Sequence, residues 1–335
     1  MNPSPPPHMQ VMQLATSFWV SQAIYVAAKL GIADLLKNGP KRSDELARSS
    51  GAHPIALHRV LRALAGFGIF REDEEGRFAT TPLAATLETG QVGRATVLSM
   101  AGPWVWSTFG ELLHSVKTGK PAFEKVHGAN VFEWFGTHPE EAGLFNDAMI
   151  GIHGGEHEAV AEAYDFTGIG TLVDVGGGTG NLLARVLERR PSVKGILQDL
   201  PAVANAGRER LKSLGLAERC RVVDGSFFES VVAGGDAYMM SHVIHDWDEP
   251  RCKKILDNCR AVVPRNGRLL LVEMVIPPGN DFHPSKMLDV VMLAAPGGRE
   301  RTEKEYAELL SASGFRLTRV VPTASPASVV EAVPA

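Results

Sequence analysis

The segment from Ser241 to Asp248 reads Ser-His-Val-Ile-His-Asp-Trp-Asp and places two histidines directly after an apolar run that predicts a buried strand. A phenol has a pKa of ~10 and free imidazole one of ~6.5, so neutral histidine can take a hydroxyl proton while another group is transferred to the oxygen. Either His242 or His245 has the chemistry of a general base.

A glycine-rich segment, Asp174-Val-Gly-Gly-Gly-Thr-Gly180, lies between a second buried strand and an amphipathic helix. Glycines let the backbone approach a ligand at the carboxyl edge of a parallel sheet, where open sheets of this kind bind ligands. Asp199 ends the next strand about 20 residues further on, the usual distance for an acid that meets ribose hydroxyls. The segment therefore predicts a nucleotide-like ligand.

The spacing of the glycines does not fit a dinucleotide. The pattern GxGxxG requires a final glycine, but this chain has Asn181 or Leu183 there, depending on where the count starts. An acid at Asp174 suits a ligand with a cationic amino acid portion better than a pyrophosphate. S-adenosylmethionine is such a ligand, and Gly176, Gly178 and Gly180 are expected to contact it.

These motifs need a sheet to position them, and the second half of the chain predicts one. Beyond Thr167, strands alternate with helices, which indicates a parallel sheet covered on both faces. The predicted fold class is α/β: a Rossmann-like, doubly wound, mostly parallel sheet with a C-terminal antiparallel strand. The predicted elements are 171–175, 181–189, 193–198, 220–223, 237–241, 251–262, 268–275, 303–312, 316–321 and 328–333.

The first hundred residues predict a separate helical unit. A long helix is expected over Ala15 to Leu36, followed by two short helices from Ser43 and Pro54 and a hairpin around residues 69–78. This is the order of a winged helix. Four consecutive acids in the hairpin would repel phosphates, so a dimerising role is favoured over DNA binding. The proline-rich stretch Met1 to Gln10 is expected to be a disordered tail.

Between the two units, a mostly helical bridge with many aromatic residues is expected from Pro103 to Tyr164. The domains are thus predicted as residues 1–100 for the winged-helix-like dimerisation domain and 101–335 for the bridge with the catalytic domain.

Composition narrows the class of protein. Lys and Arg total 34 against 38 for Asp and Glu, so the chain lacks the positive charge of a nucleic-acid binder. The odd count of three cysteines without CxxC spacing argues against disulfides and zinc clusters. No apolar run approaches the ~20 residues of a membrane span. A cytoplasmic protein without nucleic-acid or membrane partners is expected.

His245-Asp246-Trp247 resembles the base motif of the plant and bacterial small-molecule O-methyltransferases, which include the caffeate and isoflavone enzymes and bacterial polyketide and carotenoid relatives. The resemblance covers nearly the whole chain. It implies an S-adenosylmethionine-dependent enzyme that methylates a hydroxyl of a small aromatic or polyketide-like molecule. It also implies that His245 is the base and that His242 is a packed histidine.

Further positions follow from the same resemblance. Glu273, in Leu-Val-Glu, and Glu300, in Pro-Gly-Gly-Arg-Glu-Arg-Thr, are implied to lie beside the imidazole and to orient it. Asp246 is implied to contact the substrate or the cofactor, and Trp247 to pack against adenine.

The remaining implied contacts concern cofactor and substrate. Besides Gly176 and Asp199, the pair Ser226-Phe227 is implied to contact the cofactor, although many relatives carry Asp where this chain has Ser226. A helix that lines the substrate pocket is implied at Phe145, Asn146 and Met149. Relatives pair as homodimers, and a partner subunit is implied to contribute to the pocket.

One motif competes with this interpretation. His153-Gly-Gly-Glu-His157 matches the HxxEH pattern of inverted zinc peptidases, but two adjacent glycines weaken the helix that such ligands need, and no acidic third ligand stands out downstream. No metal is therefore expected. Alternatives to O-methylation are N- or C-methylation on the same fold, and a ligand-sensing winged-helix regulator.

Overall fold

The structure is a computed structural model that describes residues 5–335. It contains two compact units, which are described separately below. Unit 1 comprises Met1–Gly110 and Glu133–Ile152, and unit 2 comprises Glu111–Phe132 and His153–Ala335. The chain thus crosses between the units three times, whereas the sequence suggested a single boundary near residue 100.

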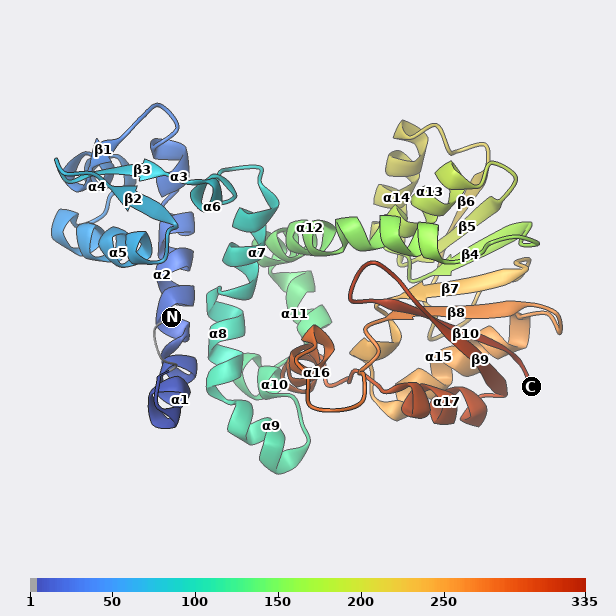
Figure 1. Cartoon of the computed structure of the whole chain (residues 1–335). Coiled ribbons are helices and arrows are strands. Elements are labelled where there is room, and N and C mark those ends of the chain that lie inside the picture. Colours follow the sequence, from blue (N-terminus) through green and yellow to red (C-terminus); the bar gives the residue numbers. More distant parts are fainter. Residues whose placement is uncertain (1–4) are drawn as a thin grey trace. The chain divides into compact units, whose positions relative to one another are not determined.

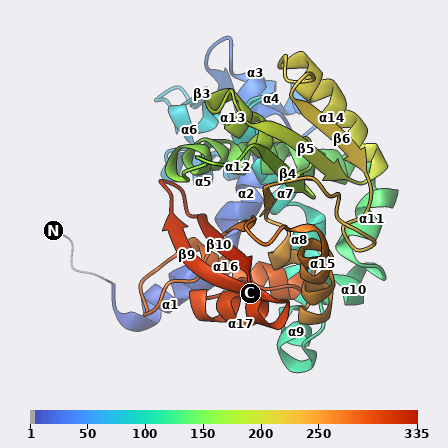
Figure 2. The ribbon, with the colours of Figure 1, turned by 90° about the vertical axis from the view of Figure 1, so that its right-hand side faces the viewer.

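The sheet of unit 2 has the strand order β6-β5-β4-β7-β8-β10-β9, with the first five strands parallel and the last two antiparallel to their neighbours (Figures 1 and 2). This confirms the predicted fold class. The strands are β4 (Thr171–Val175), β5 (Lys194–Asp199), β6 (Cys220–Asp224), β7 (Ala237–Ser241), β8 (Arg268–Glu273), β9 (Phe315–Pro322) and β10 (Ser328–Pro334).

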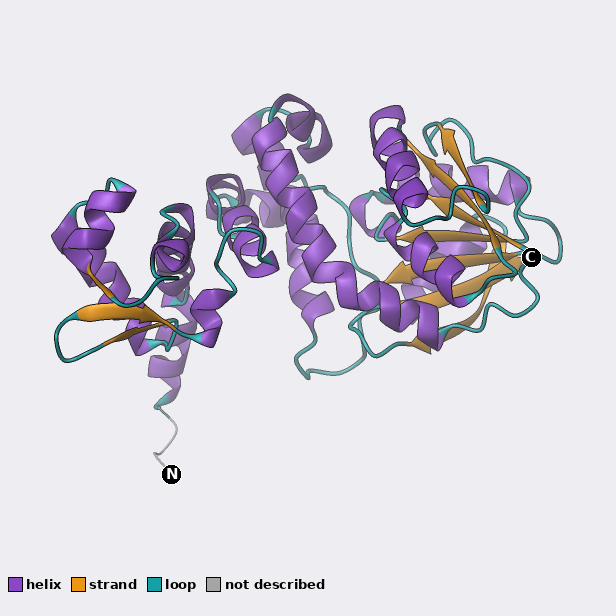
Figure 3. Cartoon of the chain, turned by 90° about the horizontal axis from the view of Figure 1, so that it is seen from above, coloured by secondary structure: helices purple, strands orange, loops and turns teal. Residues whose placement is uncertain are grey.

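Helices cover both faces of this sheet (Figure 3) because successive strand residues point to opposite sides. Leu172 and Met239 pack on one face with α13 (Asn181–Arg189) and α14 (Pro201–Ser213). Val173 and Met240 pack on the other face with α15 (Glu249–Val262) and α17 (Glu303–Ala312). The structure confirms the bounds predicted for β4, β7, α13 and α17, but α14 had no counterpart in the sequence prediction.

Unit 1 contains a winged-helix arrangement. The helices α4 (Ser43–Ser50) and α5 (Pro54–Gly66) precede the hairpin of β2 (Phe70–Glu72) and β3 (Arg77–Thr80), and β1 (Lys41–Arg42) completes a small antiparallel sheet. Leu57, Leu61 and Leu64 are buried on one face of α5, as their spacing predicted. The order of helices and hairpin is therefore confirmed.

The long helix predicted over Ala15 to Leu36 is wrong. The chain forms α1 (Pro7–Thr16), α2 (Phe18–Lys29) and α3 (Ile32–Leu35), with a break at Ser17 and a left-handed Gly31 at φ 65°. The predicted disordered tail is also wrong from Pro7 onward, because α1 begins there; residues 1–4 lie outside the described part. Proline at the first helical position costs no hydrogen bond, which permits this start.

The predicted helical bridge is confirmed, although its helices divide between the two units. One of them, α12 (Pro139–Ala163), is continuous across the unit boundary at residue 152. The other helices of the chain are α6 (Pro82–Ala85), α7 (Val92–Met100), α8 (Pro103–Gly110), α9 (Leu112–Thr118), α10 (Ala122–His127), α11 (Val131–Thr137) and α16 (Pro284–Ala294). None of the helices within residues 5–335 is long and apolar enough to cross a membrane.

Candidate active site

The two histidines of the motif lie on a turn that follows β7, here called the base turn (residues 242–246). His242 has a φ of 51°, and its backbone N–H donates to the carbonyl of Val272 on the neighbouring strand. A single turn of 3-10 helix, Ile244–Asp246, then contains His245, which is only 7% exposed. The turn thus buries the second histidine at the carboxyl edge of the sheet.

Two fully buried carboxylates hold the His245 ring. Nδ1 of His245 donates to Oε1 of Glu300 at 2.6 Å. Glu273 anchors the turn itself, since its Oε1 accepts the backbone N–H of Ile244 at 3.0 Å while its Oε2 lies 3.7 Å from Nδ1 of His245. The structure therefore brings His245 together with the two acids that the resemblance implied.

The carboxylates change the proton affinity of the site. Burial lowers the pKa of His245, but the charges of Glu273, Asp246 and Glu300 outweigh it and raise the pKa to about 10. Burial raises the pKa of Glu273 to about 8 and that of Asp246 to about 6, and in both cases His245 works in the opposite direction. The ordinary imidazole pKa assumed from the sequence does not apply here, because the ring shares its proton with a buried acidic cluster.

Several residues that support the base turn were missed by the sequence analysis. Arg301 is completely buried, pairs with Glu249 at 2.9 Å and lies 3.4 Å from the carbonyl of Ile244. Asp289 of α16 accepts the backbone N–H of Glu300 at 2.9 Å. Arg301 belongs to the Pro-Gly-Gly-Arg-Glu-Arg-Thr segment, but arginine is usually exposed, so its burial could not be predicted from the residue type.

The second glycine of that segment, Gly298, lies in close contact with the base turn. A Cβ on Gly298 would lie 1.9 Å from the carbonyl oxygen of His245, and the next residue, Arg299, donates its backbone N–H to the same oxygen at 2.8 Å. The segment therefore packs directly on the base turn at a distance that only glycine permits.

The glycine-rich loop lies between β4 and α13, as the sequence predicted. Gly176, Gly178 and Gly180 all have positive φ angles between 61° and 77°. Gly178 donates its backbone N–H to Oδ2 of Asp199 at 2.8 Å, which ties the loop to the end of β5. The two parts of the predicted nucleotide site are thus in contact.

Asp174 lies beneath this loop. It is 1% exposed, and a Cβ on Gly177 would come within 2.4 Å of its carboxylate. Burial and the charge of Asp199 raise the pKa of Asp174 to about 7. The carboxylate supports the loop from below, and its direct contact with the cofactor stays a prediction.

Aromatic side chains form one wall beside the loop. A Cβ on Gly176 would lie 3.0 Å from the ring of Phe227. Trp247 packs edge-on against Phe228 and stacks on Phe132 with 5.1 Å between ring centroids. Ser226 uses its hydroxyl to accept the N–H of Phe228 at 3.2 Å, which is a local turn contact. Trp247 and Phe227 are half-buried, which leaves part of each ring open to a ligand.

The implied substrate residues lie in the other unit. Phe145, Asn146 and Met149 belong to the part of α12 in unit 1, where Phe145 packs against Phe135 with 4.9 Å between ring centroids. His245 belongs to unit 2. Their role in substrate binding stays a prediction.

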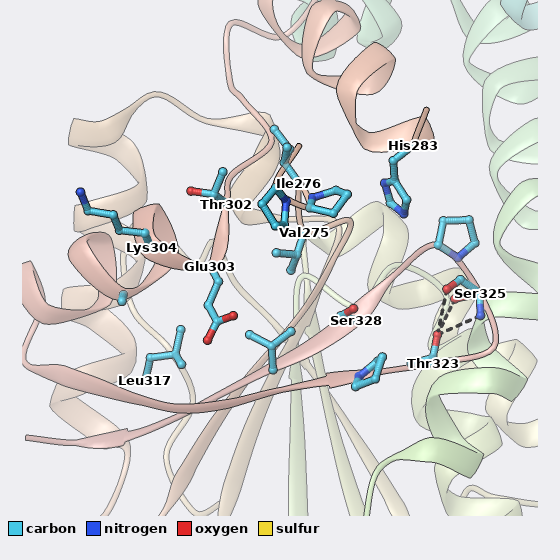
Figure 4. Close-up of a pocket in the computed structure, with 16 residues that line it drawn as sticks. Val275, Ile276, His283, Thr302, Glu303, Lys304, Leu317, Thr323, Ser325 and Ser328 are labelled. Carbon is cyan, nitrogen blue, oxygen red and sulfur yellow. Dashed lines mark hydrogen bonds between the residues drawn. The ribbon is translucent and has the colours of Figure 1, made fainter. Parts of the chain in front are cut away.

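A separate cavity of about 730 Å³ lies at the antiparallel end of the sheet (Figure 4). Val275, Thr302, Glu303, Leu317 and Ser325 are among its lining residues, and none of the predicted site residues is among them. It is therefore distinct from the base turn and the glycine loop.

The chain matches two known sequence profiles. The O-methyltransferase domain profile matches residues 109–316, and the O-methyltransferase dimerisation domain profile matches residues 12–90. Among curated relatives, a phenazine O-methyltransferase of Lysobacter antibioticus is 45% identical over 97% of this chain and 95% of its own length. A phenazine-1-carboxylate N-methyltransferase of Pseudomonas aeruginosa is 31% identical over 93% of this chain and 92% of its own length.

Solved structures agree with these matches. The structure of a mitomycin 7-O-methyltransferase has a TM-score of 0.93, with 36% identity and 98% coverage of both chains. An O-methyltransferase from neocarzinostatin biosynthesis, solved with S-adenosylmethionine and 2-hydroxy-5-methyl naphthoic acid, has a TM-score of 0.84, with 33% identity and coverage of 94% of this chain and 96% of the other. This chain thus belongs to the O-methyltransferase family and is an S-adenosylmethionine-dependent O-methyltransferase.

Proposed function

We propose that this enzyme transfers the methyl group to a hydroxyl oxygen of a small aromatic or polyketide-like natural product, with His245 as general base. The observation that carries the proposal is the bond from Nδ1 of His245 to Glu300 at 2.6 Å. Because that nitrogen is occupied, the neutral ring keeps its lone pair on Nε2, where a substrate hydroxyl can deliver its proton.

The proposed roles of the acids follow from the geometry. As the hydroxyl proton moves to Nε2, the ring becomes an imidazolium, and Glu300 and Glu273 stabilise this charge without leaving their places. S-adenosylmethionine supplies an electrophilic methyl group on a sulfonium sulfur. The chain itself has to orient the hydroxyl, exclude water and accept the proton.

The residues at the glycine loop fit this cofactor. The left-handed glycines of the loop carry no side chains, so a ligand can approach the backbone closely. Asp199 is half-buried, and its carboxylate accepts two backbone N–H groups and has further lone pairs for ribose hydroxyls. The open part of Trp247 offers a flat apolar surface for adenine. The Ser226 hydroxyl accepts the N–H of Phe228, and its proton can still be donated to the nucleoside.

Of the relatives named above, two are named for phenazine and mitomycin and one was solved with a naphthoic acid, and this supports a fused or substituted aromatic acceptor. The test is to incubate the enzyme with S-adenosylmethionine and a panel of hydroxylated phenazines, naphthoates and polyketide-like phenols, with product mass as readout. Gain of one methyl group on a phenolic oxygen supports the proposal. A panel in which only non-aromatic alcohols react would overturn it.

Transfer to nitrogen is the second candidate, because one relative at 31% identity is named as an N-methyltransferase. An acceptor with both an aromatic hydroxyl and an aromatic amine distinguishes the two. Fragmentation of the product locates the methyl group, and methylation of the amine alone would favour the second candidate.

A further inference from the structure

A second group of titratable side chains adjoins the base turn and has no part in the mechanism above. We call His153, Glu156 and His242 the His-Glu-His cluster. Glu156 is 4% exposed, and its Oε1 accepts from Nε2 of His242 at 2.6 Å. Its Oε2 lies 3.5 Å from Nδ1 of His153, and the two imidazole rings are 4.2 Å apart between centroids.

The cluster has buried nitrogen atoms that are poorly satisfied. Nδ1 of His242 is inaccessible to solvent and has no hydrogen-bond partner within the described chain, and Nδ1 of His153, equally buried, has only the carboxylate of Glu156 near it, at 3.5 Å. Buried polar atoms in native proteins are normally satisfied, so these two weakly satisfied nitrogens require an explanation. A bound cation would provide one, since it takes the lone pair of a neutral imidazole.

The spacing of the donors suits a metal ion. One ligand atom from each of the three side chains lies within 4.8 Å of the others. In a tetrahedral zinc site with bonds of about 2.0–2.1 Å, ligand atoms are roughly 3.3 Å apart, so small side-chain shifts are sufficient. Two histidines and one glutamate are also a ligand set that zinc uses in proteins, with one position left open.

The backbone supplies an independent observation. His242 is the one residue other than glycine with a positive φ in the range 5–335. Such conformations cost energy and cluster at functional sites. The base function does not account for this one, because it is His245 that the acids hold.

The reasons stated above against a metal concerned a different ligand set, His153 and His157 with an acid downstream. The helix α12 runs unbroken from Pro139 to Ala163 through Gly154 and Gly155. The third ligand is His242, distant in sequence. Within α12 the pair is His153 and Glu156, three residues apart, while His157 is not part of the cluster.

From these observations we infer that His153, Glu156 and His242 form a binding site for a divalent transition metal ion of the zinc type. The proposed methyl transfer does not need a metal at this site. The rings of His242 and His245 are 5.0 Å apart between centroids, so a bound ion would bring positive charge close to the base.

The test uses the full-length enzyme treated with chelator and then titrated with zinc chloride in a calorimeter. We expect saturable binding of about one ion per chain. Replacing any one ligand, in His153→Gln, Glu156→Gln or His242→Gln, is expected to weaken binding at least about 10-fold, as losses from a metal's coordination environment do. The matched control is His157→Gln, which changes the same motif on the same helix and is expected to bind zinc like the wild type.

Cobalt(II) provides a second readout, because its visible absorption reports four-coordinate geometry. The strong tetrahedral spectrum is expected in the wild type and in His157→Gln and is expected to be lost in Glu156→Gln. Affinity for S-adenosylmethionine shows that each variant is folded. Absence of saturable zinc binding, or equal binding by folded ligand variants and the wild type, would overturn the inference, while the proposed methyl transfer would be unaffected by either result.

Discussion

Removal of the His245 imidazole isolates the proton-transfer step. His245→Ala is expected to lower turnover by roughly 10²- to 10⁴-fold, the usual contribution of a positioned general base, and to leave affinity for S-adenosylmethionine nearly intact. Steady-state kinetics and calorimetry measure the two quantities.

An acidic substrate analogue is the control for this change. If its hydroxyl is already ionised at the assay pH, it needs no base and should lose much less activity than an ordinary phenol. Equal losses for both substrates, or a larger loss for His242→Ala, would show that His245 is not the base.

The pH dependence of kcat/KM should follow the proton on His245. Its raised pKa of about 10 means that the free enzyme holds an imidazolium at neutral pH, and only the neutral ring can accept a proton. The rate for a phenol should therefore rise with pH towards that value. Glu300→Gln removes one of the charges that raise the pKa, so its profile should rise at lower pH. Profiles that coincide for the two enzymes would contradict this assignment.

Chelator should leave methyl transfer unchanged. Three carboxylates, those of Asp246, Glu273 and Glu300, do approach His245. No magnesium requirement is expected, because the proposed proton acceptor is the His245 ring and because Glu273 and Glu300 are engaged by Ile244 and by that ring. Loss of activity in chelator, restored by magnesium, would refute it.

The chemistry of single residues could be predicted where a motif carries it, and not where burial creates it. Asp199 and the glycines were predicted from their types and spacing, whereas the choice of His245 over His242 came from the family resemblance. Arg301 was missed, because complete burial of an arginine depends on partners from distant segments. The raised pKa of His245 has the same origin, since it arises from acids on other elements.

At the scale of elements, the segment around Gly298 should be intolerant of any side chain. Gly298→Ala places a Cβ 1.9 Å from the His245 carbonyl, so the segment or the base turn has to move. Overpacking of this kind typically costs about 1–3 kcal/mol, and turnover should fall because the base is displaced. Thermal denaturation and kcat are the measurements.

Gly154→Ala is the matched control. Gly154 lies in α12 with nothing within 4 Å of an added Cβ, so alanine should stabilise the helix by up to ~1 kcal/mol and leave kcat unchanged. If Gly298→Ala kept the stability and the kcat of this control, the close packing of Gly298 on the base turn would not be needed for activity.

The bounds of helices and strands could be predicted where nearby residues in the sequence determine them. The periodicity of apolar residues and the types of the flanking residues were sufficient for β4, β7, α13 and α17. They failed over residues 15–36, because a continuous apolar face hides the break at Ser17 and the left-handed Gly31. Glycine permits that conformation but does not require it, so tertiary packing decides whether a helix stops there.

At the scale of the whole molecule, the enzyme should be a homodimer assembled through its N-terminal segment. Val11, Leu14 and Trp19 of α1 and α2 are 66%, 75% and 64% exposed, an apolar surface that a partner would cover. Sedimentation should show a dimer, and Leu14→Glu combined with Trp19→Glu should shift it towards monomer.

The control for this prediction places a charge elsewhere. Leu214 is 41% exposed at the end of α14, and Leu214→Glu should leave the dimer intact. A wild-type enzyme that sediments as a fully active monomer would contradict the predicted assembly.

The position of β10 in its sheet has a consequence for how the protein is made. This strand is synthesised after the other six, yet it lies between β8 and β9 and pairs with both. Until β10 has been synthesised, the edge of β8 is unpaired and β9 has no neighbour through which to join the sheet. The sheet therefore cannot be completed before β10 is available, and a premature stop codon before Ser328 should yield an aggregation-prone product rather than a shortened enzyme.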